Sequence, residues 1–427
     1  MKFIFPDSLD LVDPSFDFHS EERSDTRIRQ RDDLYAHEVF TPVPFQGILV
    51  SKAIVDGIGT GSRYTLAQRH RLMRQGVRDF FRLESVGKGR LIAVGDCGAF
   101  SYIKEAKPPF KPAEVIDFYD GLGFDWGISV DHVILGYNSA WDEPLPGIDP
   151  VPRDYAARQR ITLELAHEFL GQCKTRKVRF EPVGVVQGWS PRSYAAAARE
   201  LQRMGFRRLA VGGLVPLKTR DIEAVVRAIA AVRRPSVPLH LLGVTRLSSI
   251  PLFASLGVES FDSTSPLRQA FKDDKDNYYT LNGTFPAIRV PQVDGHVRLR
   301  RLISKGQVDP VRARRLELRC LELLRKFDRG EVKGTTVLDT ILEYAELCED
   351  WKAGSRGYAE VLDARPWRQC RCSICAAIGV DVIIFRGAER NRRRGFHNVW
   401  VFAQRLAREI GRPAVRARRP RSEAATT

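Results

Sequence analysis

No stretch of the 427-residue chain is apolar for long enough to cross a membrane, and residues 1–7 are too few and too soon acidic to form a signal peptide. Cysteine is also scarce. Seven cysteines are present, three of them within six residues, so the disulfide framework of a secreted protein is not indicated. No internal repeat occurs beyond an alternation of short strands and helices. These absences predict a cytoplasmic protein without a membrane partner, and a hydrophobic content of 43% is enough for a sizeable core.

Acidic residues are fewer than basic residues in this chain. The chain has 68 Lys and Arg against 52 Asp and Glu, which gives a formal net charge of +16. A polyanion such as a nucleic acid is therefore the expected partner. The bias is strongest near the C-terminal end, where twelve arginines lie between Arg386 and Arg421. We expect residues 412–427 to form a disordered basic tail.

Short β-branched segments alternate with amphipathic helical segments from residue 47 onward, which is typical of βα units in a parallel sheet. One helix is clearly marked by Ser190 as N-cap, Pro191 at the first helical position and Gly205 at the end. An eighth strand is predicted between residues 279 and 293. The other seven strands are predicted at residues 47–51, 91–96, 127–131, 183–187, 209–212, 239–244 and 258–262.

This pattern predicts the α/β fold class, as a TIM (β/α)8 barrel with a small C-terminal zinc-binding subdomain. A doubly wound open sheet is the alternative. We favour the barrel because polar residues follow many of the strands, at the ends where barrel active sites are assembled. The predicted domains are an N-terminal extension (1–46), the barrel (47–365), the zinc-binding subdomain (366–411) and the basic tail (412–427).

The zinc-binding subdomain is predicted from Cys370, Cys372, Cys375 and His397. Three thiolates and one imidazole form a tetrahedral ligand set that Zn²⁺ favours. Because protein fills all four positions, the site is expected to be structural, since a catalytic zinc keeps one position for water. A zinc deaminase would also need a His-x-Glu partner, and the one such triplet, at residues 19–21, lies far away in an irregular stretch.

Two aspartates, Asp96 and Asp262, end predicted strands. Two carboxylates at one barrel mouth suit glycosyl transfer, with one as the nucleophile and one handling protons. Capping of the following turn is the simpler alternative for each. Gln187 and the Gly212–Gly213 pair add an amide side chain and close backbone donors, which suit the edge of a flat heterocycle.

The order of these motifs resembles the tRNA-guanine transglycosylases over residues 94–410. The opening of the chain contains Pro6-Asp-Ser8 and Asp13-Pro-Ser-Phe-Asp-Phe18. With these residues it looks more like the DpdA-type branch, which exchanges guanine for a 7-deazaguanine base in DNA. The motifs that carry the resemblance are Asp96-Cys-Gly-Ala-Phe100, Ser129-Val-Asp131, Val185-Val-Gln-Gly188, Ala210-Val-Gly-Gly-Leu214, Leu242-Gly-Val244, Phe261-Asp262 and Cys-x-Cys-x2-Cys with His397-Asn398.

The resemblance implies roles for the site residues. Asp262 is the nucleophile that attacks C1′, and Asp96 is the proton acceptor for the incoming base. Cys370, Cys372, Cys375 and His397 are the ligands of a structural Zn²⁺. The implied base-binding residues are Phe100, Asp131, Gln187, Gly212, Gly213, Leu214, Leu242 and Arg268.

The sequence also departs from the family's tRNA enzymes. Cys97, Ala99 and Ser101 stand where those enzymes usually have Ser, Gly and Gln. After Asp262 the family's Arg-Ser-Gly-Arg type of segment is replaced by residues 267–279, in which Arg268 is retained. This segment bears Phe271, Tyr278 and Tyr279, which we expect to lie beside a flipped base, where they fill the gap that it leaves or stack on its neighbours.

We therefore predict an enzyme that replaces guanine in DNA with a 7-deazaguanine such as preQ0, through a covalent aspartyl-glycosyl intermediate. Because a duplex must be opened first, we expect either an ATPase partner that opens DNA or a preference for melted DNA. One alternative is the same chemistry on tRNA, as in queuine or archaeosine formation. The other is a non-catalytic nucleic-acid-binding paralogue, which the presence of both Asp96 and Asp262 disfavours.

Overall fold

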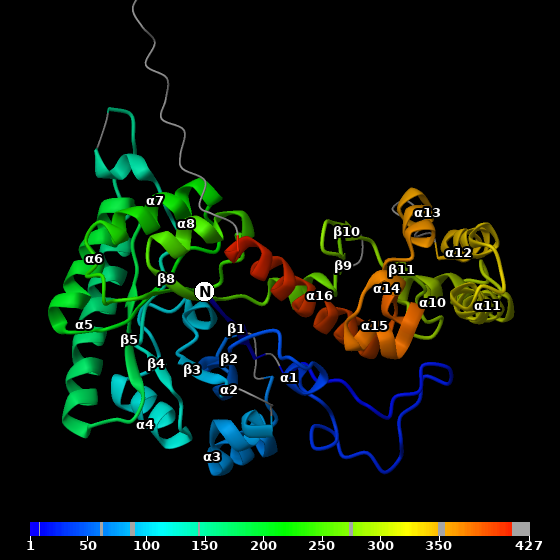
Figure 1. Cartoon of the computed structure of the whole chain (residues 1–427), viewed down its shortest axis with the longest axis horizontal. Helices are drawn as coiled ribbons and strands as arrows, with labels where there is room; N and C mark the ends of the chain where they lie inside the picture. Colours follow the sequence, from blue (N-terminus) through cyan, green and yellow to red (C-terminus); the bar gives the residue numbers. More distant parts are fainter. Residues whose placement is uncertain are drawn as a thin grey trace, which may run out of the picture.

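The computed structural model describes residues 1–7, 9–59, 63–85, 90–143, 146–272, 276–348 and 355–411. The predicted tail at 412–427 lies outside the described residues. Eight parallel strands close into a barrel in chain order, as predicted (Figure 1). They are β1 (Lys2–Pro6), β2 (Gly47–Ser51), β3 (Ile92–Asp96), β4 (Trp126–Ile128), β5 (Glu181–Val186), β6 (Leu209–Val211), β7 (Leu239–Leu241) and β8 (Val258–Asp262).

The prediction for the eighth strand is wrong. The missing strand is β1, inside the segment predicted as an N-terminal extension, where Ile4 pairs with Gly47 of β2 and Asp262 of β8. Residues 279–293 instead contribute to two small sheets that contain β9 (Tyr278–Tyr279), β10 (Thr284–Phe285), β11 (Ile288–Arg289) and β12 (Ile384–Phe385). The short Lys-Phe-Ile-Phe-Pro run is followed by a long irregular stretch, so no local βα rhythm marks it as a strand.

The barrel has an apolar layer inside and another between its strands and helices. Ile4 lies in the interior cluster with Leu49, Val94 and Val185. Phe3 faces outward, and its ring lies 5.0 Å from that of Phe402 in the last helix. This alternation follows from the period-two geometry of a strand.

Helices cover the outside of the barrel. Helix α6 starts at the Ser190 cap with Pro191 and ends at Gly205, whose φ is 108°, which confirms the predicted helix signals. The other helices of this part are α1 (Ala36–Val39), α2 (Lys52–Asp56), α3 (Leu66–Phe80), α4 (Pro112–Leu122), α5 (Arg153–Arg176), α7 (Thr219–Ala230), α8 (Ile250–Ser255) and α9 (Ser265–Gln269), with α6 spanning Pro191–Met204.

A helical lobe stands beside the barrel on the right of Figure 1, and α16 (Gly387–Ile410) runs from it back to the barrel, where it contacts α8 and α9. The lobe includes helices that the predicted boundary at residue 365 assigned to the barrel domain. Its other helices are α10 (Val297–Ser304), α11 (Pro310–Arg329), α12 (Gly334–Leu347), α13 (Ser355–Ala364), α14 (Pro366–Gln369) and α15 (Ser373–Ile378). Over the described residues, every helix is too short or too polar to span a bilayer.

Several arginines of the basic C-terminal region are buried in ion pairs instead of facing a polyanion. Arg386 and Arg390 both bind the Glu21 carboxylate, at 2.6 and 2.5 Å. Arg390 also donates to Asp381 at 2.9 Å, and Arg394 is fully buried against backbone carbonyls. Arg386 and Arg390 thereby attach the N-terminal segment to the start of α16. Fewer of these arginines are available to bind a polyanion than the sequence indicated.

Candidate active site and metal centre

A cavity of about 410 Å³ opens at the carboxyl ends of the barrel strands. The predicted site residue Leu214 does not line it and is completely buried. The other predicted site residues all line it: Asp96, Phe100, Asp131, Gln187, Gly212, Gly213, Leu242, Asp262 and Arg268. The fold thus brings together side chains that are up to 172 positions apart in the chain, from Asp96 to Arg268.

Asp131 and Gln187 form the floor of the cavity. The Gln187 amide donates to Asp131 Oδ2 at 2.6 Å, and the Ile134 backbone N–H donates to Gln187 Oε1 at 3.2 Å. The Cys97 thiol lies 3.1 Å from Asp131 Oδ1. Burial, together with Asp131, raises the pKa of Cys97 well above its usual value, so the thiol stays protonated and donates to the carboxylate. Cys97 stands where the family's tRNA enzymes usually have Ser, and its thiol hydrogen bond helps to hold the Asp131 carboxylate in place.

Asp96 lies at the end of β3 and is half-buried. Burial raises its pKa to about 8, and the nearby Asp131 and Asp262 carboxylates add to the effect. At neutral pH Asp96 is therefore mainly the neutral acid. A carboxyl group with a pKa near the working pH is suited to both giving and taking a proton.

Asp262 ends β8 and is held by one of its two oxygens. Its Oδ1 accepts from the Gly243 backbone N–H at 3.0 Å and lies 3.2 Å from His240 Nε2. The other ring nitrogen of His240 lies 2.9 Å from Ser260 Oγ, which fixes the ring. No hydrogen bond reaches Oδ2 from the described residues, so this oxygen is available to attack.

Two glycines let the backbone approach the floor of the cavity. Gly213 has a φ of +73°, and a Cβ there would collide with the carbonyl oxygen of Ile134. A Cβ on Gly212 would collide with the Gln187 amide. A side chain at either position would therefore displace the polar groups described above.

Phe100 and Arg268 flank the mouth of the cavity. Phe100 lies on a short 3-10 helix and is 51% exposed, which is unusual for a large aromatic ring and leaves its face free to stack on a base. Arg268 lies on α9 and is exposed.

The sequence analysis missed His240 and Asp7. His240 is a polar residue between two leucines in the three-residue strand β7, and this pattern is the sequence signal that could have identified it. Asp7 follows β1 and accepts from the Tyr64 hydroxyl at 2.5 Å and the Leu9 N–H at 2.9 Å. Burial raises its pKa to about 6. Asp7 lines the cavity as an additional carboxylate, and it was missed because β1 was not recognised.

The predicted metal ligands converge beside α16. The ligand atoms of Cys370, Cys372, Cys375 and His397 lie within 4.8 Å of one another. His397 Nδ1 lies 3.3 to 3.5 Å from the three sulfurs, while its Nε2 lies 2.8 Å from the Tyr279 carbonyl oxygen. That carbonyl can only accept, so Nε2 carries the proton and the Nδ1 lone pair faces the thiols. The geometry and the donor set fit Zn²⁺.

The aromatic residues after Asp262 are divided between two places. Tyr278 is buried at the metal centre, where its ring stacks on His397 at 4.1 Å and its hydroxyl lies 3.2 Å from Cys375 Sγ. Tyr279 packs beneath Arg405. The predicted position of these two tyrosines beside a flipped base is therefore wrong, whereas Phe271 is 39% exposed.

Comparisons with known proteins agree with the geometry. The family model described as Queuine tRNA-ribosyltransferase matches residues 99–321. A DNA-guanine transglycosylase of Salmonella montevideo is 46% identical over 411 residues, which cover 95% of this chain and 96% of that protein. A tRNA-guanine(15) transglycosylase of Thermococcus kodakarensis is 31% identical over 195 residues, or 44% of this chain and 30% of that protein. One from Methanocaldococcus jannaschii is 26% identical over 242 residues, or 55% and 34%. The chain therefore belongs to the tRNA-guanine transglycosylase family and is a pentosyltransferase of the guanine transglycosylase type.

Proposed function

We propose that the protein replaces guanine in DNA with a 7-deazaguanine base, preferably preQ0. The observation that carries this proposal is the similarity, over nearly the whole of both chains, to a protein named DNA-guanine transglycosylase. The archaeal tRNA enzymes match about half of this chain and about a third of their own length. A cytoplasmic location suits this substrate.

The cavity supports a two-step exchange. In the first step Asp262 Oδ2 attacks C1′ of the flipped nucleotide, the bond between C1′ and N9 breaks, and the departing guanine takes a proton from Asp96. In the second step the incoming base loses its N9 proton to Asp96, and N9 attacks C1′ and displaces Asp262. The phosphodiester backbone stays intact, and Asp96 ends in its starting protonation state.

The same cavity supports recognition of both bases. Asp131 and Gln187 offer an acceptor and an amide to a purine edge, the backbone at Gly212 and Gly213 supplies further polar groups, and Phe100 supplies a stacking face. Leu242 contributes an apolar wall, and Arg268 places positive charge at the mouth for a phosphate. The metal centre lies outside this cavity, and a bound Zn²⁺ would hold the lobe in place structurally.

The two alternative functions are the same exchange on tRNA and a non-catalytic role in binding nucleic acid. The tRNA alternative is supported by the description of the matching family model. The non-catalytic paralogue is disfavoured because both Asp96 and Asp262 line the cavity. We further propose that an ATPase partner opens the duplex, because extruding a paired base costs a few kcal/mol.

The test is incubation with labelled preQ0 and, separately, a DNA single strand, the same sequence as a duplex, and folded tRNA at matched salt. We expect label in DNA, with more in the single strand than in the duplex. Label in tRNA alone would establish the alternative substrate, and label in no polymer would support the non-catalytic paralogue. Salt must be matched because affinity for any polyanion falls steeply as salt rises.

A further inference from the structure

A second hollow, of about 930 Å³, lies beside the catalytic cavity between the N-terminal segment, the start of α3, the region after α9 and α16. Two carboxylates of the described residues, Asp10 and Asp33, line it. Its cationic side chains are Arg23, Arg27, Arg29, Arg63, Arg268, Lys272 and Arg392. We call this hollow the arginine groove, and its excess of positive charge suits a polyanion.

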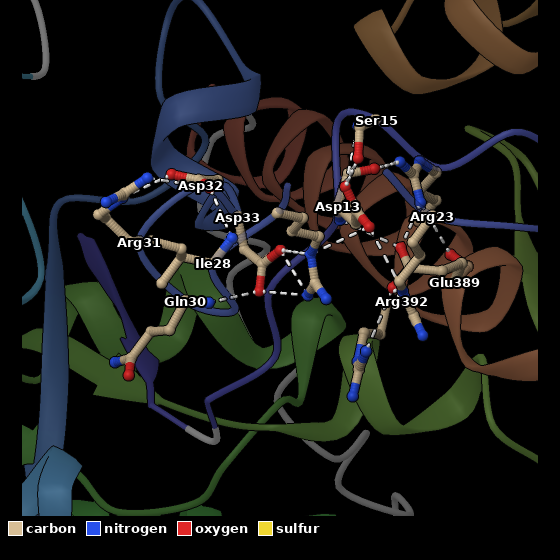
Figure 2. A network of polar contacts seen from close by, with 12 residues as sticks. Asp13, Ser15, Arg23, Ile28, Gln30, Arg31, Asp32, Asp33, Glu389 and Arg392 are labelled. Carbon is tan, nitrogen blue, oxygen red and sulfur yellow. Dashed lines mark hydrogen bonds and ion pairs between the residues drawn. The ribbon is translucent and has the colours of Figure 1, made fainter. Parts of the chain in front are cut away.

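One wall of the groove is fixed by buried acids. The Asp33 carboxylate receives both Nε and Nη2 of Arg27 at 2.7 Å. Asp13 and Glu389, which are almost completely buried, hold Arg23 at 3.3 and 2.9 Å. Figure 2 shows this network, in which Glu389 also lies near Arg392. These guanidinium groups are therefore oriented in advance, although much of their charge is neutralised.

Other cations of the groove are available for a ligand. Arg29, Arg63, Arg268 and Lys272 are all exposed, and they form no ion pair or side-chain hydrogen bond with any residue that the structure describes. Exposed cations of this kind are typical contacts for phosphates, because they replace the counterions of a nucleic acid.

The groove continues into the catalytic cavity, because Arg63 and Arg268 line both. Phe271 also lines the groove, with 39% of its surface exposed. An exposed aromatic ring among cations is the arrangement that binds unpaired nucleotides, by stacking on a base while cations hold the backbone. A base can enter the cavity only after leaving its stack, so its neighbours in the strand are close at hand.

We propose that the arginine groove binds the DNA strand on one side of the exchanged nucleotide, with Arg29 and Lys272 on phosphates and Phe271 stacked on an adjacent unpaired base. This inference rests on the proposed function, since it takes the strand that delivers its guanine to the cavity as the ligand. It adds a binding surface formed largely by the N-terminal segment, outside the base-exchange site itself.

The test measures binding of a fluorescent single-stranded DNA over a series of salt concentrations. Arg29→Ala and Lys272→Ala are each expected to weaken binding several-fold and to reduce the slope of log K against log salt by about 0.7. Arg207→Ala is the matched control, because this exposed arginine precedes β6 at the opposite end of the barrel. Arg63 and Arg268 are left intact because they also line the catalytic cavity. Slopes equal to that of Arg207→Ala in both groove variants would overturn the proposal.

Phe271→Ala separates stacking from charge. It is expected to weaken binding by about fivefold or more without changing the salt slope, and Phe271→Tyr is expected to restore affinity. An unchanged affinity in Phe271→Ala would remove the stacking contact from the proposal. Base exchange by the wild-type protein is measured in parallel. A wild type that modifies no DNA overturns the proposed function, whereas an active wild type with unaffected groove variants overturns only this inference.

Discussion

His240 Nε2 lies 3.2 Å from Asp262 Oδ1, and Ser260 Oγ lies 2.9 Å from the other nitrogen of the same ring. The imidazole is almost completely buried, and it holds Asp262 through Oδ1, the oxygen that also accepts from the Gly243 N–H. His240 is therefore a positioning residue for the proposed nucleophile, since it acts on the substrate only through Asp262.

His240→Gln is expected to lower kcat for exchange by roughly tenfold to a hundredfold, because small errors in the position of a nucleophile are costly. The KM for DNA should stay the same, since His240 does not face the mouth. Steady-state kinetics separate the two constants, and a thermal melt checks that the variant is folded. A higher KM with normal kcat would contradict the positioning role.

Asp262→Ala is expected to lower exchange by roughly 10⁴-fold or more while DNA binding survives, because phosphate contacts dominate affinity. Asp96→Asn keeps the nucleophile but cannot give or take a proton, so exchange should be severely impaired, and the covalent protein–DNA adduct that Asp262 still forms should persist. Denaturing electrophoresis and intact mass spectrometry detect the adduct. Wild-type exchange by Asp262→Ala would disprove the covalent mechanism.

The raised pKa of Asp96 predicts a pH-dependent stability. The unfolded chain releases this proton near the ordinary aspartate pKa of 3.8, whereas the folded protein holds it up to a pKa of about 8. The folded state therefore binds more protons between these values, and this group makes the free energy of unfolding fall as pH rises from about 4 to about 8. The Asp96→Asn variant does not lose stability in this way as pH rises. The difference in Tm between this variant and the wild type should therefore be more in favour of the variant at pH 8.5 than at pH 5. Asp117→Asn, at an exposed carboxylate, is the control. An equal Tm difference at both pH values would contradict the prediction.

The ligand cluster predicts one tightly bound zinc per chain. Cys372→Ser should abolish the stoichiometric zinc and unfold the lobe, since structural zinc contributes on the order of 10 kcal/mol to small domains. Elemental analysis and thermal melts measure both effects. Cys173→Ser, at a buried cysteine of α5 outside the cluster, should keep its zinc. Zinc-free wild-type protein of normal stability would rule out the site.

Glu21 is predicted to hold the N-terminal segment on α16. Although burial opposes it, the Arg386 hydrogen bond and the charges of Arg390 and Arg386 lower the pKa of Glu21 to about 2. The stabilisation is thus complete above pH 4.5 and is lost as pH falls toward 2. Glu21→Gln should destabilise the protein by about 3 kcal/mol at pH 7, because Arg386 and Arg390 each lose one of their two carboxylate partners and keep only Glu317 and Asp381. Urea unfolding at pH 7 and pH 3 should show a smaller difference at the lower pH. Glu22→Gln, at an exposed neighbour, is the control.

Local sequence patterns were sufficient to predict those features whose residues all lie within one short segment. The Cys-x-Cys-x2-Cys spacing places three ligands in one turn, and the strand-end aspartates Asp96 and Asp262 follow apolar runs of the correct length. The barrel followed from the βα rhythm, because each unit must bury its strand and helix against the next. These features depend on neighbours in the chain, so the sequence by itself determined them.

Tertiary structure alone decided the features that depend on distant partners. The run at Lys2–Pro6 becomes a strand because β2 and β8 leave a gap that only another strand can pair with. Tyr278 turned out to support His397, and buried arginines such as Arg390 turned out to pair with Glu21, because burial of a polar group requires a partner that can lie anywhere in the chain. The arginine groove likewise exists only where the N-terminal segment, α9 and α16 meet, so no local pattern could reveal it.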